Sequence, residues 1–304
     1  MSGAILSARF FWYYRLMDSA VKKTYCPRLW DEIFIDEKGK VFACCWDEAV
    51  PFGDIRKGLL SDICNSRSAL SQRKKSLAGR LECYSNCNLL KKGSLPAPGA
   101  GKKARIDYSD LKRFKIRFGV SCNIKCIMCA QDHRKKDTLE LKIIKKNIDL
   151  TPFESVEMEG GEPLFMKASR EFFDYAVARG KKVSFLTNGL LINDAMAKQI
   201  ARYSLFICIS INAATKKSHE LVNAGSSWER VLDNVRRIRK YRRKFGTGVE
   251  IQGHMTLTRE NIMEAPLFIG NFKKLGFDVI EFSHAQSSVK YFSGKPGKIG
   301  RAHV

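Results

Sequence analysis

The sequence lacks a long, uncharged apolar stretch. Its most apolar terminus, Met1 to Ala20, is interrupted by Arg9, Arg15 and Asp18. A secretory signal needs a cationic start followed by a clean apolar core, and a membrane span needs about 20 apolar residues. We therefore expect neither a signal peptide nor a membrane helix. We predict an amphipathic helix over residues 1–24 and a cytoplasmic location.

Acidic residues are scarce relative to basic ones. Lys and Arg number 54 against 31 Asp and Glu, which gives a net charge of +23. The densest basic run, Arg236 to Lys244, could bind a polyanion through phosphate contacts. It also ends a helical pattern, where cations suit the helix dipole and face water, and this second interpretation is favoured. The charge excess predicts an anionic substrate or partner, with nucleic acid less favoured and no membrane partner.

The ten cysteines do not form an evenly spaced disulfide framework. They are clustered, which in a chain of 304 residues indicates metal ligation in a reducing compartment. The tightest group is Cys122, Cys126 and Cys129, which has no fourth cysteine nearby. Iron–sulfur clusters and zinc both select thiolates, and three cysteines on a [4Fe–4S] cube would leave one iron open. In the alternative, His133 completes a tetrahedral zinc site.

A second cysteine-rich unit spans residues 25–92. Two short strands, Ile33 to Ile35 and Val41 to Ala43, flank a turn at residues 36–39, and a helical stretch covers Leu59 to Leu77. Four thiolates would hold one cluster and stabilise a unit with little core; they are Cys26, Cys44, Cys83 and Cys87. Cys45 is an alternative ligand to Cys44, and zinc is the competing occupant. Cys64 and Cys208 are expected to be core residues.

The segment that follows is rich in Gly, Pro, Ala and Lys, and we predict a linker over residues 93–110. The core domain is predicted over residues 111–290, followed by a tail over residues 291–304. The last six residues, Ile299 to Val304, read like a translated sequencing adapter rather than a protein segment. We therefore expect a truncated gene model that lacks at least one further helix.

From residue 111 onward, strand patterns alternate with helical patterns, as in parallel βα units. The expected strands are Phe114 to Val120, Ser155 to Glu159, Lys182 to Thr187, Leu205 to Ile211, Gly248 to Thr256 and Phe277 to Ser283. The expected helices are Leu139 to Ile148, Ser169 to Arg179, Asn193 to Tyr203, Trp228 to Lys240 and Met263 to Leu275. A partial barrel and a doubly wound sheet both fit this order.

Several of these strands have one polar face, whereas buried parallel strands are usually apolar throughout. The polar positions include Lys115, Arg117, Glu157, Glu159, Glu250, Gln252, His254 and Glu281. Because the helices must cover the apolar face, the polar faces should converge on the other side. We therefore predict a wet, charged chamber suited to a substrate, rather than a filled core.

The cysteine triad after the first strand and Gly160-Gly161-Glu162-Pro163 after the second together resemble the radical S-adenosylmethionine (radical SAM) superfamily. Thr187-Asn188-Gly189 after the third strand and Ser210-Ile211-Asn212 after the fourth add to the likeness. The resemblance implies a partial (β/α)6 TIM-like barrel. It also implies a [4Fe–4S] cluster on Cys122, Cys126 and Cys129 whose open iron chelates S-adenosylmethionine.

The resemblance implies further contacts with the cofactor. Gly160 to Pro163 would receive the methionine amino group through backbone and carboxylate, and Ser210 and Asn212 would hydrogen-bond the ribose. The sequence departs from the common pattern at Met128, where an aromatic residue is usual, and at Asn212, where aspartate is frequent. It departs again at Asn223, where many members carry an arginine.

The unit at residues 25–92 resembles a SPASM or twitch domain, the auxiliary-cluster module of the same superfamily. The matching residues are Cys26, Gly39, Cys44, Cys83 and Cys87. The module usually follows the barrel but precedes it here. Since only part of its usual cysteine set is present, the resemblance implies one auxiliary [4Fe–4S] cluster.

The expected function is that of a radical SAM enzyme acting on a peptide or small molecule, supplied by a low-potential electron donor. The catalytic residues themselves cannot be assigned from the sequence. The alternatives are a zinc-containing nucleic-acid-binding protein and a catalytically silent iron–sulfur protein. Iron and sulfide analysis distinguishes the radical SAM enzyme from the zinc protein, and formation of 5′-deoxyadenosine distinguishes it from the silent protein.

Overall fold

The computed structural model describes residues 21–44, 49–84, 87, 89, 101–132 and 139–284. The tail over 291–304, Cys45, His133 and residues 93–100 of the predicted linker therefore lie outside the described residues. So does the expected N-terminal helix, except for its last residues, Val21–Thr24, which form a strand instead because they pair with Leu81–Tyr84. The chain divides into two compact units. Unit 1 comprises Met1–Phe34 and Lys40–Leu111, and unit 2 comprises Ile35–Gly39 and Lys112–Val304.

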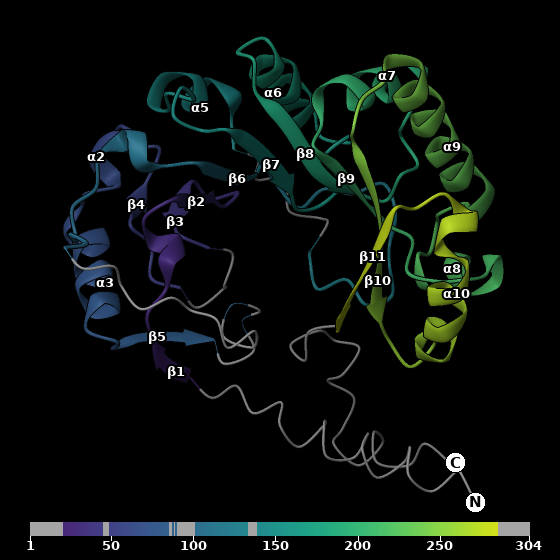
Figure 1. Cartoon of the computed structure of the whole chain (residues 1–304), viewed down its shortest axis with the longest axis horizontal. Coiled ribbons are helices and arrows are strands. Elements are labelled where there is room, and N and C mark those ends of the chain that lie inside the picture. The colour runs from purple at the N-terminus through teal and green to yellow at the C-terminus, as the bar shows by residue number, and fades with distance from the viewer. Residues whose placement is uncertain are drawn as a thin grey trace, which may run out of the picture. The chain divides into compact units, whose positions relative to one another are not determined.

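Unit 2 contains six parallel strands that lie side by side in chain order (Figure 1). They are β6 (Arg113–Arg117), β7 (Ser155–Glu159), β8 (Lys182–Thr187), β9 (Phe206–Ser210), β10 (Glu250–Leu257) and β11 (Val279–His284). The sheet curves, and the helices lie on its outer side. The expected partial (β/α)6 barrel is confirmed, with the cysteine-rich unit before it.

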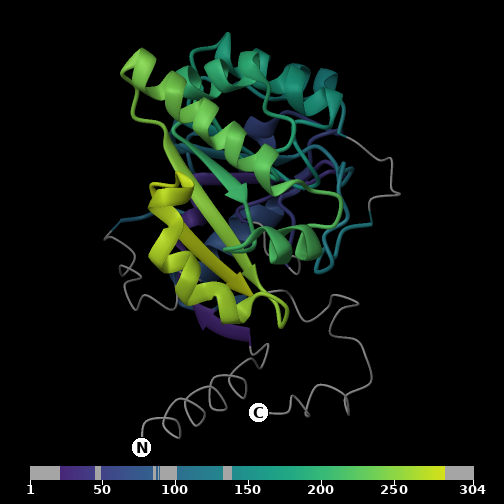
Figure 2. The same cartoon turned by 90° about the vertical axis from the view of Figure 1, so that its right-hand side faces the viewer.

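The helices of unit 2 are α5 (Leu141–Asn147), α6 (Lys167–Val177), α7 (Asp194–Tyr203), α8 (Lys216–Val222), α9 (Trp228–Phe245) and α10 (Ala265–Leu275), with the 3-10 turn η3 (Ile262–Glu264). Figure 2 shows α10 running alongside the strands β10 and β11. The five helices expected from sequence are all present. The sequence reasoning missed α8, a short helix whose residues are mostly charged or polar.

Alternation along the strands explains why the helices cover only one face. Phe114, Ile116, Val156 and Met158 are buried on the outer face, while the intervening residues of β6 and β7 are half-buried or exposed. An aromatic group anchors α6 to this outer face: the Phe172 ring lies 5.2 Å from that of Phe118 and 6.2 Å from that of Phe114. Each such buried ring contributes about 1.5–3 kcal/mol to folding.

Unit 1 is built from short strands around two helices. Strands β1 (Val21–Thr24) and β5 (Leu81–Tyr84) pair antiparallel, while β2 (Glu32–Ile35), β3 (Lys40–Phe42) and β4 (Gly53–Asp54) lie next to one another. The helices are α2 (Leu60–Ile63) and α3 (Arg67–Leu77), with the 3-10 turns η1 (Pro27–Leu29) and η2 (Tyr108–Asp110). The predicted hairpin and helical stretch are both present, the latter divided in two at Cys64–Ser66.

One buried arginine joins three segments of unit 1. The Arg73 side chain on α3 is fully buried and donates to the carbonyls of Leu29 (2.7 Å), Cys64 (2.7 Å) and Ala104 (3.2 Å). Burial lowers the pKa of Arg73 to about 10, so the guanidinium stays charged at neutral pH. The described end of the predicted linker, from residue 101, is therefore tied to unit 1.

Replacing Arg73 with lysine should destabilise unit 1 by about 3 kcal/mol, because an ammonium cannot reach all three carbonyls and hydrogen bonds from charged groups contribute about 1.5–3 kcal/mol each. Urea denaturation should show a lower midpoint. Arg67→Lys, at the exposed first position of the same helix, is the matched control and should leave the midpoint unchanged. Equal midpoints for both variants would contradict this role of Arg73.

Candidate functional site

The four motifs of unit 2 follow four consecutive parallel strands. The cysteine triad comes after β6, Gly160–Pro163 after β7, Thr187–Gly189 at the end of β8 and Ser210–Asn212 at the end of β9. The carboxyl ends of parallel strands meet at the same edge of a sheet, where ligands of such folds bind. The sequence motifs are thus brought to one edge of unit 2.

The loop that carries the three cysteines is hydrogen-bonded to the end of α8 and to the segment that follows it. The backbone N–H of Lys125 donates to the Ala224 carbonyl (2.8 Å), and that of Ile127 donates to the Val222 carbonyl (3.0 Å). Met128 is buried against Val222. Methionine therefore fills a packing position here, where an aromatic residue is usual in the family pattern. Two backbone hydrogen bonds and one apolar contact fix the loop.

The three thiols share one environment. Burial and then the nearby thiols of Cys129 and Cys122 raise the pKa of Cys126 to about 12. Burial also raises the pKa values of Cys122 and Cys129, opposed at Cys122 by the backbone N–H of Ile124. Metal clusters bind the thiolate form of cysteine. A cluster that binds these sulfurs must therefore displace their protons.

Among the described residues, no three His, Cys, Asp or Glu side chains converge closely enough to hold a single metal ion. The cysteines of a cube bind separate irons, so cluster ligation needs less convergence than a zinc site does. The donor set fits a cluster, because it consists of soft sulfur ligands at one loop.

Gly161 lets the loop after β7 approach the cysteine loop. Gly161 has φ +48, and a Cβ there would lie 2.3 Å from the Ser121 carbonyl oxygen. Its N–H donates to Oε1 of Gln131 (2.8 Å), and the next N–H, of Glu162, donates to that same Ser121 carbonyl (2.9 Å). Glycine is therefore needed for the contact between the two loops.

The Glu162 carboxylate ties this loop to β8. It is buried and accepts hydrogen bonds from the Thr187 hydroxyl (2.7 Å) and from the backbone N–H groups of Asn188 (2.7 Å) and Leu164 (3.1 Å). Burial raises its pKa to about 7, and the three donors oppose that rise. Sequence reasoning missed this structural use of the carboxylate, which was expected to face the cofactor. Asn188 in turn donates to the Cys122 sulfur (3.8 Å) and to Asn123 (2.8 Å).

A buried amide network lies beneath Cys126. The Asn223 side chain is fully buried; its Oδ1 accepts from the Cys126 thiol (3.4 Å) and from Nδ2 of Asn212 (2.9 Å). Its Nδ2 donates to the carbonyls of Ser210 (3.0 Å) and Ile211 (3.3 Å). Asn212 itself has φ +53 and accepts from the Thr256 N–H (2.7 Å). The network connects the cysteine loop to the end of β9.

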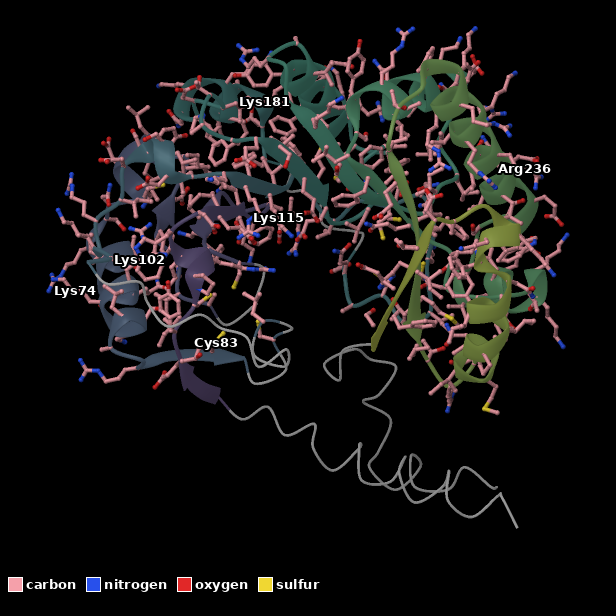
Figure 3. The ribbon with its side chains drawn as sticks, in the orientation of Figure 1. Lys74, Cys83, Lys102, Lys115, Lys181 and Arg236 are labelled. Atoms are coloured by element: carbon pink, nitrogen blue, oxygen red, sulfur yellow. The ribbon has the colours of Figure 1, made fainter. Side chains whose placement is uncertain are left out.

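The four cysteines of unit 1 also lie near one another. A hydrogen bond with the Cys87 thiol, burial, and the thiols of Cys26 and Cys44 all raise the pKa of Cys83. Figure 3 labels Cys83 on β5. The backbone N–H of Cys26 donates to the Ser76 hydroxyl (2.8 Å), which fixes this cysteine against α3. Cys64 is a fully buried core residue, as expected.

The inner face of the unit 2 sheet is polar, as predicted. Lys115 on β6 pairs with Glu157 on β7 (3.0 Å), and Arg117 pairs with Glu159 (3.0 Å). Figure 3 shows Lys115 on this face and Lys181 and Arg236 on the outer, helical side. The face continues across β10 and β11 with Glu250, Gln252, His254 and Glu281. Among the described residues of this face there are more carboxylates than cations, so the face does not share the net positive charge of the whole chain.

Burial shifts the pKa of two groups on this face. It raises the pKa of Glu159, against the opposing charge of Arg117, and it lowers the pKa of His254. Cys208 was expected in the apolar core. It is buried, but it lies beside Gln252 in the sheet and so shares the polar face.

The basic run forms the last three turns of α9, and much of it is engaged within the chain. Arg236 pairs with Asp233, Arg237 donates to the Ile192 carbonyl (3.0 Å), and Arg242 donates to the Val249 carbonyl (3.0 Å) and to Asp278. The helix ends at Phe245 and is capped by Gly246, whose φ is +63. Arg237 and Arg242 are thus structural, which the spacing of charges did not reveal.

Comparison with known proteins identifies the family. Residues 116–268 match the model of the Radical SAM superfamily, and residues 26–88 match SPASM, an iron–sulfur cluster-binding domain. Since the first match covers half of the chain, the protein belongs to the radical SAM superfamily and is an enzyme. The family implies a [4Fe–4S] cluster and S-adenosylmethionine as cofactors, and the SPASM match implies auxiliary iron–sulfur clusters.

Individual relatives are distant. An uncharacterised protein of Methanocaldococcus jannaschii is 27% identical over 143 residues, which are 45% of this chain and 47% of that protein. The mycofactocin maturase MftC of Mycobacterium ulcerans is 30% identical over 124 residues, 38% of this chain and 34% of the relative. The chain therefore matches half or less of the length of these curated relatives.

Among solved structures, Streptococcus suis SuiB bound to S-adenosylmethionine is similar with a TM-score of 0.45 and 16% identity. The match covers 86% of this chain and 63% of SuiB. Among the described residues, no helix is long and apolar enough to cross a membrane.

Replacing Gly161 with alanine should destabilise unit 2 by several kcal/mol. An alanine must adopt a positive φ, which costs about 1–2 kcal/mol, and its Cβ would also collide with the Ser121 carbonyl. Gly180→Ala is the matched control, because Gly180 has φ +73 and nothing within 4 Å of the added Cβ. Thermal unfolding should show a larger loss for Gly161→Ala, and equal losses would refute the loop contact.

Replacing Asn223 with aspartate should weaken cluster retention, because a carboxylate would face the Cys126 sulfur. We expect iron to be lost to a chelator at least tenfold faster than from the wild type, in line with the effect of outer-shell partners on metal affinity. Asn234→Asp is the control: Asn234 is also buried and donates to the Gly189 carbonyl (2.7 Å). Similar iron loss in both variants would show that the effect is one of general stability.

Proposed function

We propose that this enzyme reductively cleaves S-adenosylmethionine at a [4Fe–4S] cluster held by Cys122, Cys126 and Cys129, and that it abstracts hydrogen from a peptide or small-molecule substrate. When bound, the cluster supplies one electron to the sulfonium, which yields the 5′-deoxyadenosyl radical. The observation that carries the proposal is the adjacency of three half-buried thiols in one loop, inside the region that matches the superfamily.

The chain's own residues position the reactants. The backbone of Gly160–Pro163 lies against the cysteine loop and would receive the methionine amino group, while the Glu162 carboxylate holds that backbone in place. Ser210 would contact the ribose from the end of β9. The Asn212 side chain already donates to Asn223 and accepts from the Thr256 N–H, so it would contact the ribose only with its remaining N–H and oxygen lone pair.

The substrate would lie against the polar inner face of β6–β11. The paired Lys115–Glu157 and Arg117–Glu159 side chains can bind both charges of a substrate. Burial lowers the pKa of the half-buried His254, so its imidazole is neutral at pH 7 and can accept a proton. Because carboxylates are in excess on this face, an anion would be repelled there. The expected anionic partner would therefore bind the outer surface. A low-potential electron donor is required because the cleavage is reductive, and a cytoplasmic site of action is part of the proposal.

We further propose that Cys26, Cys44, Cys83 and Cys87 hold one auxiliary [4Fe–4S] cluster. Their mutual proximity supports this, since each of the other three raises the pKa of Cys83. A small unit whose core is limited also gains folding energy from a bound metal centre.

Anaerobically reconstituted wild-type protein should contain about eight irons per chain, four for each cube. Replacing Cys122, Cys126 and Cys129 with alanine should halve the iron and abolish 5′-deoxyadenosine formation on reduction with S-adenosylmethionine. Cys208→Ala is the control and should keep its full iron content. A colourless zinc protein, or a full set of clusters without 5′-deoxyadenosine, would contradict the proposal.

A further inference from the structure

Arg28 lies beside the four cysteines of unit 1. It belongs to η1, the 3-10 turn that begins directly after Cys26, and the backbone N–H groups of Arg28 and Leu29 both point at the Cys26 sulfur. Because Cys26 is fixed to α3 through Ser76, the turn and its arginine have a defined position relative to this ligand.

The guanidinium of Arg28 is held by a single carboxylate. One Nη donates to the Glu32 carboxylate (3.3 Å), which is only 1% exposed, while the Arg28 side chain itself is 29% exposed. Glu32 lies four residues further along, on β2. The ion pair therefore fixes one side of the guanidinium and leaves its other edge for another acceptor.

The Arg28 guanidinium also lies near sulfur. The Arg28 charge interacts with the thiols of Cys87, Cys26 and Cys44. Its Nε is buried and has no hydrogen-bond partner among the described residues. A buried donor without a partner is costly, and sulfur atoms of a bound cluster are acceptors that would remove this cost.

An adjacent cation changes the reduction potential of an iron–sulfur cluster. Hydrogen bonds to the sulfurs and nearby charge are among the factors that set the potential. A cube with four thiolates is an anion, and it becomes more negative when it takes up one electron. A fixed cation therefore stabilises the reduced form more than the oxidised form and raises the potential.

We propose that Arg28 is a positioning and tuning residue that hydrogen-bonds the auxiliary cluster through its buried Nε edge and raises the reduction potential of that cluster. The proposal rests on the auxiliary cluster proposed above. It assigns the unit an electron-accepting role, because a cluster with a raised potential takes up an electron more readily. The electron enters the cube itself, and no bond to Arg28 forms or breaks.

The test is a redox titration followed by electron paramagnetic resonance. The full chain is used with Cys122, Cys126 and Cys129 replaced by alanine, so that the auxiliary cluster gives the only signal. In Arg28→Gln the equilibrium constant for one-electron reduction should fall about tenfold, which is about 59 mV. Arg67→Gln removes the same charge from an exposed position of unit 1 and should leave the potential unchanged.

Arg28→Lys keeps the charge but not the Nε–H edge, so its potential should lie between those of the wild type and Arg28→Gln. The signal reports only the assembled fraction, so incomplete assembly in a variant does not hide the shift. Equal potentials in all four proteins would overturn the role of Arg28. Absence of any iron from the parent triple-alanine protein would instead overturn the auxiliary cluster itself.

Discussion

The structure of the site depends on how closely two backbone loops approach each other at the edge of the parallel sheet. The loop after β7 can contact the cysteine loop only because Gly161 has no side chain, and the Ser121 carbonyl accepts the Glu162 N–H in the space that this leaves. From the other side, Val222 and Ala224 accept hydrogen bonds from the same cysteine loop. Held from both sides, the loop keeps its three thiols together although burial and their mutual repulsion oppose ionisation.

The two cysteine sites are built by the same physical means in different units. Each places thiols where burial raises their pKa values, so that each site favours a group that binds thiolates and offsets the cost of ionisation. Their surroundings differ in charge. The triad contacts the amides of Asn188 and Asn223 and lies near the Glu162 carboxylate, whereas the unit 1 cysteines lie beside the guanidinium of Arg28. Such a difference in nearby charge is a means of giving two clusters different potentials.

Much of this architecture could be predicted from the sequence, because it follows from periodicity and spacing. The bounds of β7 and β8 match the expected ones, and the polar inner face follows from alternation along the strands. The end of α9 was expected at residue 240 but lies at Phe245, where the left-handed Gly246 terminates the helix. The roles of Asn223 and Glu162 could not be predicted, because each depends on contacts with distant segments. Asn223 meets Cys126 across 97 residues of chain, and Glu162 meets Thr187 across 25.

We propose that a cluster on the cysteine triad leaves one iron open to S-adenosylmethionine. The most direct measurement is the electron paramagnetic resonance spectrum of the reduced protein before and after the cofactor is added, with Cys26, Cys44, Cys83 and Cys87 replaced by alanine so that one cluster remains. S-adenosylmethionine should change the g-values, because it would bind the open iron directly. A reduced cluster whose spectrum is unchanged at saturating cofactor would contradict the proposed open iron.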